Sequence, residues 1–198
     1  MARDYRKKGL DSTGRMILAV LRSRGLPGLS TLELGCGVGG LTIELARSGA
    51  ISATGMDLSP NMISTAKALA GESDVGGSIT FTVGDGARAL LPRADVVVLD
   101  AVMCCYPDLT ALVANTSGSA GKYYAYSIPD DTRLGGRLLR FLLPLQSLLR
   151  RRKGFRFYMH PPSKVSALLE RRGFTQIFSG TTGYFWLVRV YSALGSGA

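Results

Sequence analysis

A glycine-rich segment at residues 33–40 is the first part of the chain with a chemical use. It begins with an acid, Glu33, and then alternates glycines with other residues through Gly35, Cys36 and Gly37 to Gly40. Glycines at such positions allow positive φ angles and let the backbone approach a ligand closely. The spacing suits a dinucleotide, a nucleoside or a tight turn. On its own, the segment therefore indicates a ligand-binding loop and leaves the ligand open.

Three aspartates follow this loop in order. Asp57 closes an apolar run about twenty residues after the glycines, where a carboxylate can accept hydrogen bonds from ribose hydroxyls. Asp85 ends the next run, just before Gly86, and Asp100 lies near the end of the run after that. In a doubly wound sheet, ligands bind beyond the carboxyl ends of the strands. The acids and the loop together predict a nucleoside site at that edge.

Candidates for catalysis lie further along the chain. His160, the single histidine, is the only side chain whose unperturbed pKa lies near neutrality, so we predict it as a general base. A structural role at the start of the helix expected from Ser163 is the alternative. Tyr106 follows the fourth apolar run and is the second catalytic candidate, as a residue of the substrate pocket. We interpret Cys104 and Cys105 as packing or pocket-wall residues, because cysteine is commonly a small buried hydrophobe.

Metal and export signals are weak in this sequence. Three cysteines and one histidine are too few and too badly spaced for a disulfide framework or a zinc cluster, so we expect no metal and a cytoplasmic location. The first eight residues are polar where a signal peptide would be apolar. The longest apolar stretch, 134–149, is interrupted by Arg137, Arg140 and Pro144, which argues against a membrane span.

Strand and helix patterns alternate along the chain. Strands are predicted at 31–34, 53–58, 79–83, 95–102 and 122–128, and helices at 11–24, 41–48, 60–70, 132–152 and 163–172. Ser59 is the predicted N-cap of the third helix, with Pro60 at its first position. Runs at 175–179 and 184–191, separated by Gly180 and Gly183, predict a terminal hairpin. The expected fold class is α/β, a doubly wound, mostly parallel seven-stranded Rossmann-like sheet with a C-terminal antiparallel hairpin.

A length of 198 residues suits one sizeable core, so we predict a single domain. Within it, residues 1–27 form a basic segment and a helix, and residues 28–131 form the core that binds the ligand. Residues 132–172 form a basic, apolar, helical lid region, and residues 173–198 form the hairpin.

The acid and glycine motifs resemble the class I S-adenosylmethionine-dependent methyltransferases over roughly residues 25–130. The resemblance implies that Asp57 binds the ribose and that Met56 and Leu58 flank the adenine. It also implies that Asp85 receives the adenine amino group, and that the glycine loop contacts the methionine moiety, with Glu33 beneath it. S-adenosylhomocysteine would be the product. The expected cofactor-binding residues are Glu33, Gly35, Cys36, Gly37, Asp57, Leu58, Asp85, Gly86 and Asp100.

A NAD-dependent dehydrogenase is the main alternative for the same loop, because Gly35, Gly37 and Gly40 also satisfy the G-x-G-x-x-G spacing. A dehydrogenase needs neither Glu33 nor the Asp85 motif. A pyrophosphate is also disfavoured beside an acidic loop. The acids therefore favour the methyltransferase interpretation.

Charge is unevenly distributed in this chain, whose net charge is +10. Residues 1–24 carry +5, residues 25–131 carry −6 and residues 132–198 carry +11. Such asymmetry favours an anionic substrate, a nucleic acid or an anionic membrane surface, and the alternative is a solvated basic face without a ligand. We interpret the predicted helix at 132–152 as a lid over a hydrophobic, anionic acceptor, with peripheral contact to an anionic membrane as one version. A helix buried beneath the N-terminal helix is the alternative.

Residues 100–190 resemble, more distantly, the magnesium-protoporphyrin O-methyltransferases, through short stretches at 104–108 and 160–162 and through the final hairpin. The expected function is methyl transfer to a small, hydrophobic and anionic acceptor. An RNA methyltransferase is an alternative, but no RNA-binding motif of a known type is present, so nucleic acid is the less favoured partner. A non-catalytic module that binds S-adenosylmethionine is the third possibility.

Overall fold

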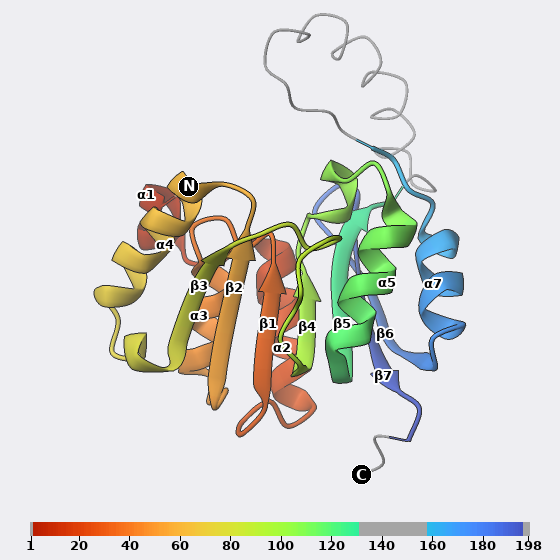
Figure 1. The fold of residues 1–198 in the computed structure, drawn as a ribbon, viewed down its shortest axis with the longest axis horizontal. Helices are drawn as coiled ribbons and strands as arrows, with labels where there is room; N and C mark the ends of the chain where they lie inside the picture. The colour runs from red at the N-terminus through yellow and green to blue at the C-terminus, as the bar shows by residue number, and fades with distance from the viewer. Residues whose placement is uncertain (1, 131–157, 196–198) are drawn as a thin grey trace, which may run out of the picture.

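The structure, a computed structural model, describes residues 2–130 and 158–195. In these residues seven strands form one sheet in the order β3-β2-β1-β4-β5-β7-β6, with helices on both faces (Figure 1). Strands β1 to β5 are parallel, and β7 runs antiparallel to both β5 and β6. The predicted fold class, including the C-terminal antiparallel hairpin, is confirmed.

Short strands alternate with helices along the described chain. The strands are β1 (Ser30–Leu34), β2 (Ser52–Asp57), β3 (Ile79–Val83), β4 (Ala94–Leu99), β5 (Ala120–Pro129), β6 (Phe174–Thr182) and β7 (Trp186–Ala193). The helices are α1 (Ala2–Lys8), α2 (Ser12–Ser23), α3 (Gly40–Arg47), α4 (Pro60–Gly71), α5 (Leu109–Ser119) and α7 (Pro162–Glu170), with 3-10 turns η1 (Gly76–Ser78) and η2 (Met103–Cys105).

Strand β4 lies at the centre of the sheet and is almost entirely buried, as a parallel strand covered on both faces should be. Our prediction that this strand continues to Val102 is wrong, because it ends at Leu99. The chain then turns at Ala101, whose φ of 56° is in the left-handed region. Apolar residues continue past the turn because Met103 and Cys104 of η2 are also buried, with Met103 0% exposed. Apolar character alone therefore could not locate the strand end.

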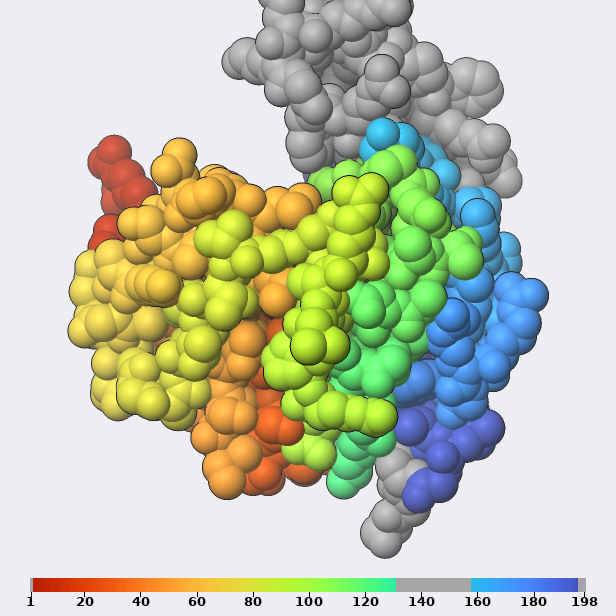
Figure 2. Space-filling model, in the orientation of Figure 1, coloured from red at the N-terminus to blue at the C-terminus, as the bar shows by residue number. Residues whose placement is uncertain are grey.

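Two layers of helices cover the sheet. Helices α2, α3 and α4 pack on one face, and α5 and α7 lie side by side on the other (Figures 1 and 2). The large buried rings of Tyr124, Tyr126 and Tyr191 belong to the core beneath α5 and α7. Because the chain changes faces between neighbouring strands β1 and β4, a crevice forms at their carboxyl ends. The glycine loop follows β1 at this point.

Two helices were missed by the sequence prediction. Helix α1 occupies the start of the chain, which we predicted as a basic segment without a helix of its own. It lies beside α4, and Arg6 forms an ion pair with Glu72 at 2.6 Å (Figure 1). Helix α5 lies between two predicted strands, and its N-cap Asp108 accepts a hydrogen bond from the N–H of Ala111 at 2.9 Å. The predicted lid helix at 132–152 lies outside the described residues.

Other local predictions can be compared with the structure directly. The hydroxyl oxygen of Ser59 accepts a hydrogen bond from the N–H of Met62 at 3.4 Å, which confirms the N-cap of α4. Gly180 lies within β6 rather than in the hairpin turn, so that boundary is wrong, whereas Gly183 lies in the turn with φ 60°. None of the described helices combines the length and apolar character that a membrane span needs.

Candidate functional site

The loop between β1 and α3 is tied to the end of β2. The N–H of Gly35 donates a hydrogen bond to the carbonyl oxygen of Met56 at 2.7 Å. Gly35, Gly37 and Gly39 have φ angles of 68°, 54° and 80°, as their spacing predicted. A Cβ atom at Gly35 would lie 2.4 Å from Cγ2 of Val102. The loop therefore needs glycine for both its conformation and its packing.

Asp57, the last residue of β2, stands between the glycine loop and α4. Its Oδ2 accepts a hydrogen bond from the N–H of Gly37 at 2.9 Å, and its Oδ1 accepts one from the N–H of Ser59 at 2.8 Å. These two bonds fix the carboxylate at the carboxyl edge of the sheet. They place it where a ligand lying across β1 and β2 would meet it.

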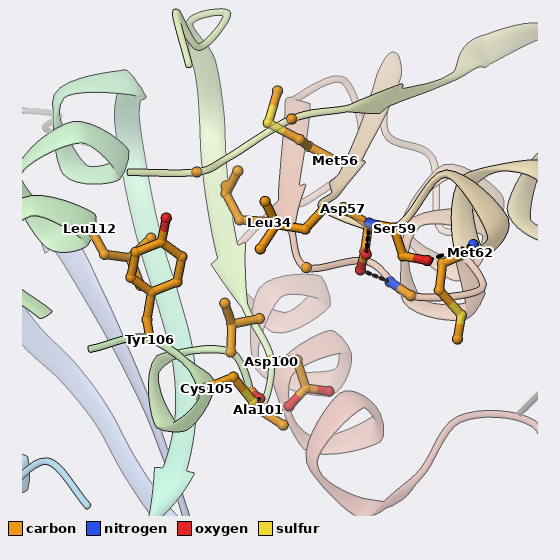
Figure 3. Close-up of a pocket in the computed structure, with 16 residues that line it drawn as sticks. Leu34, Met56, Asp57, Ser59, Met62, Asp100, Ala101, Cys105, Tyr106 and Leu112 are labelled. Atoms are coloured by element: carbon orange, nitrogen blue, oxygen red, sulfur yellow. Dashed lines mark hydrogen bonds between the residues drawn. The ribbon is translucent and has the colours of Figure 1, made fainter. Parts of the chain in front are cut away.

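A cavity of about 560 Å³ opens at this edge (Figure 3). Its volume is within the usual range for small-molecule and cofactor sites. Most of its wall is apolar or backbone. The wall consists of Leu34, Gly35, Gly37, Met56, Asp57, Leu58, Ser59, Met62, Gly84, Gly86, Asp100, Ala101, Val102, Cys105, Tyr106 and Leu112.

The charged side chains that the structure describes in this wall are both acids, Asp57 and Asp100. A third carboxyl group, that of Glu33, lies beneath the glycine loop, is 4% exposed and accepts a hydrogen bond from Thr42. Burial raises the pKa of Glu33 to about 8, and the charge of Asp100 adds to this rise. Burial also raises the pKa of Asp100 to about 6, against the hydrogen bond from Ser127. These acids give the cavity a negative electrostatic potential, which suits a ligand with a positive charge.

Asp85 and Tyr106 meet on the side of the cavity opposite Asp57. The hydroxyl of Tyr106 donates a hydrogen bond to Oδ1 of Asp85, and the same oxygen accepts the N–H of Ala87 at 2.9 Å. The ring of Tyr106 lines the cavity next to Leu112 (Figure 3). The loops after β3 and β4 are thereby joined at this end of the cavity.

Known proteins resemble this chain over most of its length. A family model described as "Methyltransferase domain" matches residues 31–118. A magnesium-protoporphyrin O-methyltransferase from Synechocystis is 31% identical over 196 residues, which cover 95% of this chain and 82% of that protein. The chain belongs to the class I S-adenosylmethionine-dependent methyltransferases.

Solved structures agree with the fold of this methyltransferase. A magnesium protoporphyrin IX methyltransferase from Synechocystis, solved with bound S-adenosylhomocysteine, has a TM-score of 0.78 and 27% identity, over 91% of this chain and 82% of that one. An S-adenosylmethionine-dependent methyltransferase from Mesorhizobium loti has a TM-score of 0.72 and 19% identity, over 93% of this chain and 100% of that one. The latter likeness shows the fold alone. S-adenosylmethionine is the cofactor of the methyltransferase.

The cavity of the methyltransferase fits this cofactor chemically. S-adenosylmethionine carries a positive sulfonium, and the acids Asp57 and Asp100 face the space it would occupy. The pyrophosphate of a dinucleotide would meet the same acids and be repelled. The dehydrogenase alternative is wrong, because the family model and the relative in Synechocystis are methyltransferases. In the described part of the chain, no group of three or more His, Cys, Asp and Glu side chains is placed to hold a metal ion.

Predicted cofactor residues fall into two groups in the structure. Three of them lie outside the cavity wall: Glu33 is beneath the loop, Cys36 packs in the core, and Asp85 accepts a hydrogen bond from Tyr106. The cofactor roles of these three residues stay predictions. Those in the wall are Gly35, Gly37, Asp57, Leu58, Gly86 and Asp100.

His160 lies behind Tyr106 rather than in the cavity wall. Its Nε2 is 2.8 Å from the carbonyl oxygen of Tyr106. Because a carbonyl only accepts hydrogen bonds, Nε2 is the donor and Nδ1 is the basic nitrogen. Burial, followed by the charge of Lys164, lowers the pKa of His160. The N-cap of α7 is Pro161, whose side chain makes no capping hydrogen bond, and the structural role of His160 at the start of this helix stays a prediction.

Sequence reasoning missed the parts of the wall that come from helices. Met62 on α4 and Leu112 on α5 both line the cavity. Leu112 belongs to a helical pattern of buried residues with Leu109, Val113 and Thr116. That pattern, after the N-cap Asp108, was the available signal for α5.

Proposed function

We propose that this methyltransferase transfers the methyl group of S-adenosylmethionine to a carboxylate on a hydrophobic ring compound of the magnesium-porphyrin type. The observation that carries the proposal is the length of chain over which the similarity to the magnesium-protoporphyrin O-methyltransferase extends. It covers 95% of the chain, whereas the general methyltransferase model matches only residues 31–118. The segment after residue 118, which includes α7, is therefore part of the likeness to the magnesium-protoporphyrin O-methyltransferase.

Binding and orientation are the tasks of the chain's own residues. S-adenosylmethionine, when bound, supplies a methyl group activated by the sulfonium. Asp57 would hold the ribose, the loop at Gly37 would contact the methionine moiety, and Asp100 would face the charged end. The strand order β3-β2-β1-β4 supports this orientation of the cofactor along the edge of the sheet. Asp57 ends β2 and Asp100 follows β4, so β1 separates the two carboxylates. Alignment of the two reactants is the main contribution that such a site can make.

A carboxylate acceptor is already ionised at neutral pH, so its methylation requires no general base. This chemistry suits the placement of His160, whose Nε2 is bonded to the carbonyl oxygen of Tyr106. We assign His160 to positioning Tyr106, and Tyr106 to contact with the acceptor. A role for His160 as a general base stays a prediction for acceptors that must lose a proton.

Two features of the described residues support a hydrophobic, anionic acceptor. Leu34, Val102 and Leu112 give the wall its apolar character. Helix α1 carries a basic last turn and has no buried residues. We propose that such basic surfaces attract the acceptor and support peripheral contact with an anionic membrane. We also propose a cytoplasmic location, which the three free cysteines support.

The test is a methyl-transfer assay with radiolabelled S-adenosylmethionine. Magnesium protoporphyrin IX with free carboxylates should take up the label as a base-labile ester. The same compound with both carboxylates already esterified should take up none. Asp57→Ala should abolish transfer through loss of cofactor binding, and Tyr184→Phe, at a ring that is 90% exposed, should leave it unchanged.

The outcomes separate the candidate acceptors. Cofactor binding without any labelled ester would contradict the carboxylate proposal. Labelling of RNA, lost when salt is raised modestly, would favour the RNA alternative. Binding without transfer to any acceptor class would favour a non-catalytic module.

A further inference from the structure

Two adjacent cysteines stand beside the cavity and have no task in the proposed methyl transfer. Cys105 is exposed and lines the cavity, and Cys104 behind it is 3% exposed. Both thiols are free, and their Sγ atoms are 3.8 Å apart. A pair of thiols at this separation can act as one two-sulfur ligand.

The turn after β4 holds the two sulfurs together. Ala101 has a left-handed φ of 56°, a conformation that costs a non-glycine residue about 1 kcal/mol or more. Its N–H donates a hydrogen bond to Oγ of Ser127 on β5 at 2.8 Å, which stabilises the turn. Its carbonyl oxygen lies 3.3 Å from Sγ of Cys104 and 3.7 Å from Sγ of Cys105. Both thiols converge on one carbonyl group anchored to the sheet.

The separation of the sulfurs favours a bridging atom over a direct bond. Two sulfurs bonded at about 2.3 Å to one tetrahedral zinc ion lie about 3.8 Å apart, and a pyramidal arsenic atom, with its narrower bond angles, would hold them slightly closer. A disulfide would require the sulfurs to approach to about 2.0 Å. A metal ion would need further protein ligands, and within residues 2–130 and 158–195 no group of three metal-binding side chains is present. Trivalent arsenic needs only two thiols, because its third position can hold a carbon group.

The two thiols also differ in reactivity. The hydrogen bond from Cys104 lowers the pKa of Cys105, against the opposing effect of burial. The same hydrogen bond, together with burial, raises the pKa of Cys104. The exposed sulfur is thus the better nucleophile, and the buried one is placed to complete a ring.

We propose that Cys104 and Cys105 form a dithiol site that captures trivalent arsenic compounds from the cavity. With an organoarsenic oxide, two S–H bonds break, two As–S bonds form, and the oxide oxygen leaves as water with the two protons. Arsenic remains trivalent, so no oxidant or reductant is consumed. The bridged pair would occupy space next to Tyr106.

Intact-protein mass spectrometry of the full chain with phenylarsine oxide tests this site. One arsenical per chain should remain bound in excess 2-mercaptoethanol, a monothiol, and should be removed by 2,3-dimercaptopropanol. Cys104→Ser and Cys105→Ser should each weaken arsenical binding about 100-fold or more, because a chelate becomes a single bond. Cys36→Ala is the matched control, since it removes the third cysteine of the chain, and it should retain the adduct.

Either of two results would overturn the proposal. One is removal of the wild-type adduct by 2-mercaptoethanol. The other is an adduct that resists 2-mercaptoethanol in Cys105→Ser. Because Cys105 is exposed, that variant stays decisive even if Cys104→Ser does not fold, and its thermal unfolding should match the wild type. Neither result depends on methyl transfer, so the outcome leaves the proposed function untouched.

Discussion

The hydroxyl of Tyr106 donates a hydrogen bond to Oδ1 of Asp85, and so connects the loop after β4 to the loop after β3. The family resemblance assigns the adenine amino group to the same carboxylate. Two donors would then compete for Asp85. The hydrogen bond of Tyr106 would have to break or be shared when the cofactor binds.

Removal of this competing donor should strengthen cofactor binding. Tyr106→Phe should increase the affinity for S-adenosylhomocysteine about threefold to tenfold, the effect of one hydrogen bond. Isothermal titration calorimetry measures the change, with Tyr184→Phe on the exposed surface as the control. Unchanged or weaker binding in Tyr106→Phe would show that adenine does not replace the hydroxyl.

Charge should distinguish the roles of Asp57 and Asp100. Asp57→Asn should weaken S-adenosylmethionine and S-adenosylhomocysteine equally, because both carry the same ribose. Asp100→Asn should weaken S-adenosylmethionine more, by about 1 kcal/mol or fivefold, because only this ligand has the sulfonium charge. The two dissociation constants for each variant provide the test. An equal loss for both ligands in Asp100→Asn would show that Asp100 does not sense that charge.

The preference of the wild-type protein for S-adenosylmethionine over S-adenosylhomocysteine should depend on pH. The pKa of Asp100 is raised to about 6 by burial, so its carboxylate is charged above this pH and neutral below it. The ratio of the two affinities should therefore move toward S-adenosylhomocysteine as the pH falls through 6. Asp100→Asn should remove this change, and a ratio that stays constant in the wild type would contradict it.

Glu33 should make the protein less stable as the pH rises. Its pKa is raised from 4.5 to about 8 by burial, so the unfolded chain ionises first. The stabilisation that neutral Glu33 provides is complete below pH 4.5 and is lost as the pH rises to about 8. Glu33→Gln cannot ionise, so its free energy of unfolding should gain a few kcal/mol relative to the wild type over that interval.

Urea unfolding between pH 5 and pH 9 measures this difference. Glu170→Gln, on the exposed surface of α7, controls for the loss of one carboxylate. Parallel stability curves for the wild type and Glu33→Gln would mean that the buried carboxyl group does not titrate as described.

Glycines of the loop and of α5 should respond in opposite directions to alanine. Gly39 has φ 80°, and a Cβ atom there would lie 2.5 Å from Cζ of Phe81. Gly39→Ala should therefore destabilise the protein by about 2–4 kcal/mol. Gly118 lies in α5 with no heavy atom within 4 Å of an added Cβ, so Gly118→Ala should stabilise it by about 0.5 kcal/mol. Chemical denaturation checks both values, and similar effects at the two positions would contradict the argument.

Periodic features of this fold could be predicted from the sequence, and long-range contacts could not. The glycine loop and Asp57 were predictable because a strand, a turn and a helix cap are read from neighbouring residues. The end of β4 was not, since the left-handed turn at Ala101 depends on Ser127 in another strand. The contact between His160 and the Tyr106 carbonyl joins residues 54 positions apart, so sequence alone identified His160 as a candidate and could not place it.

The switch of faces between β1 and β4 divides the cavity between two stretches of chain. Asp57 and the glycine loop come from the first two βα units, whereas Tyr106 and His160 come from later segments. Substitutions on the acceptor side can accumulate without disturbing the hydrogen bonds of Asp57 to Gly37 and Ser59. Gene duplication could therefore yield descendants with new acceptors and an inherited cofactor. In such a lineage, the first half of the chain would change more slowly than the second.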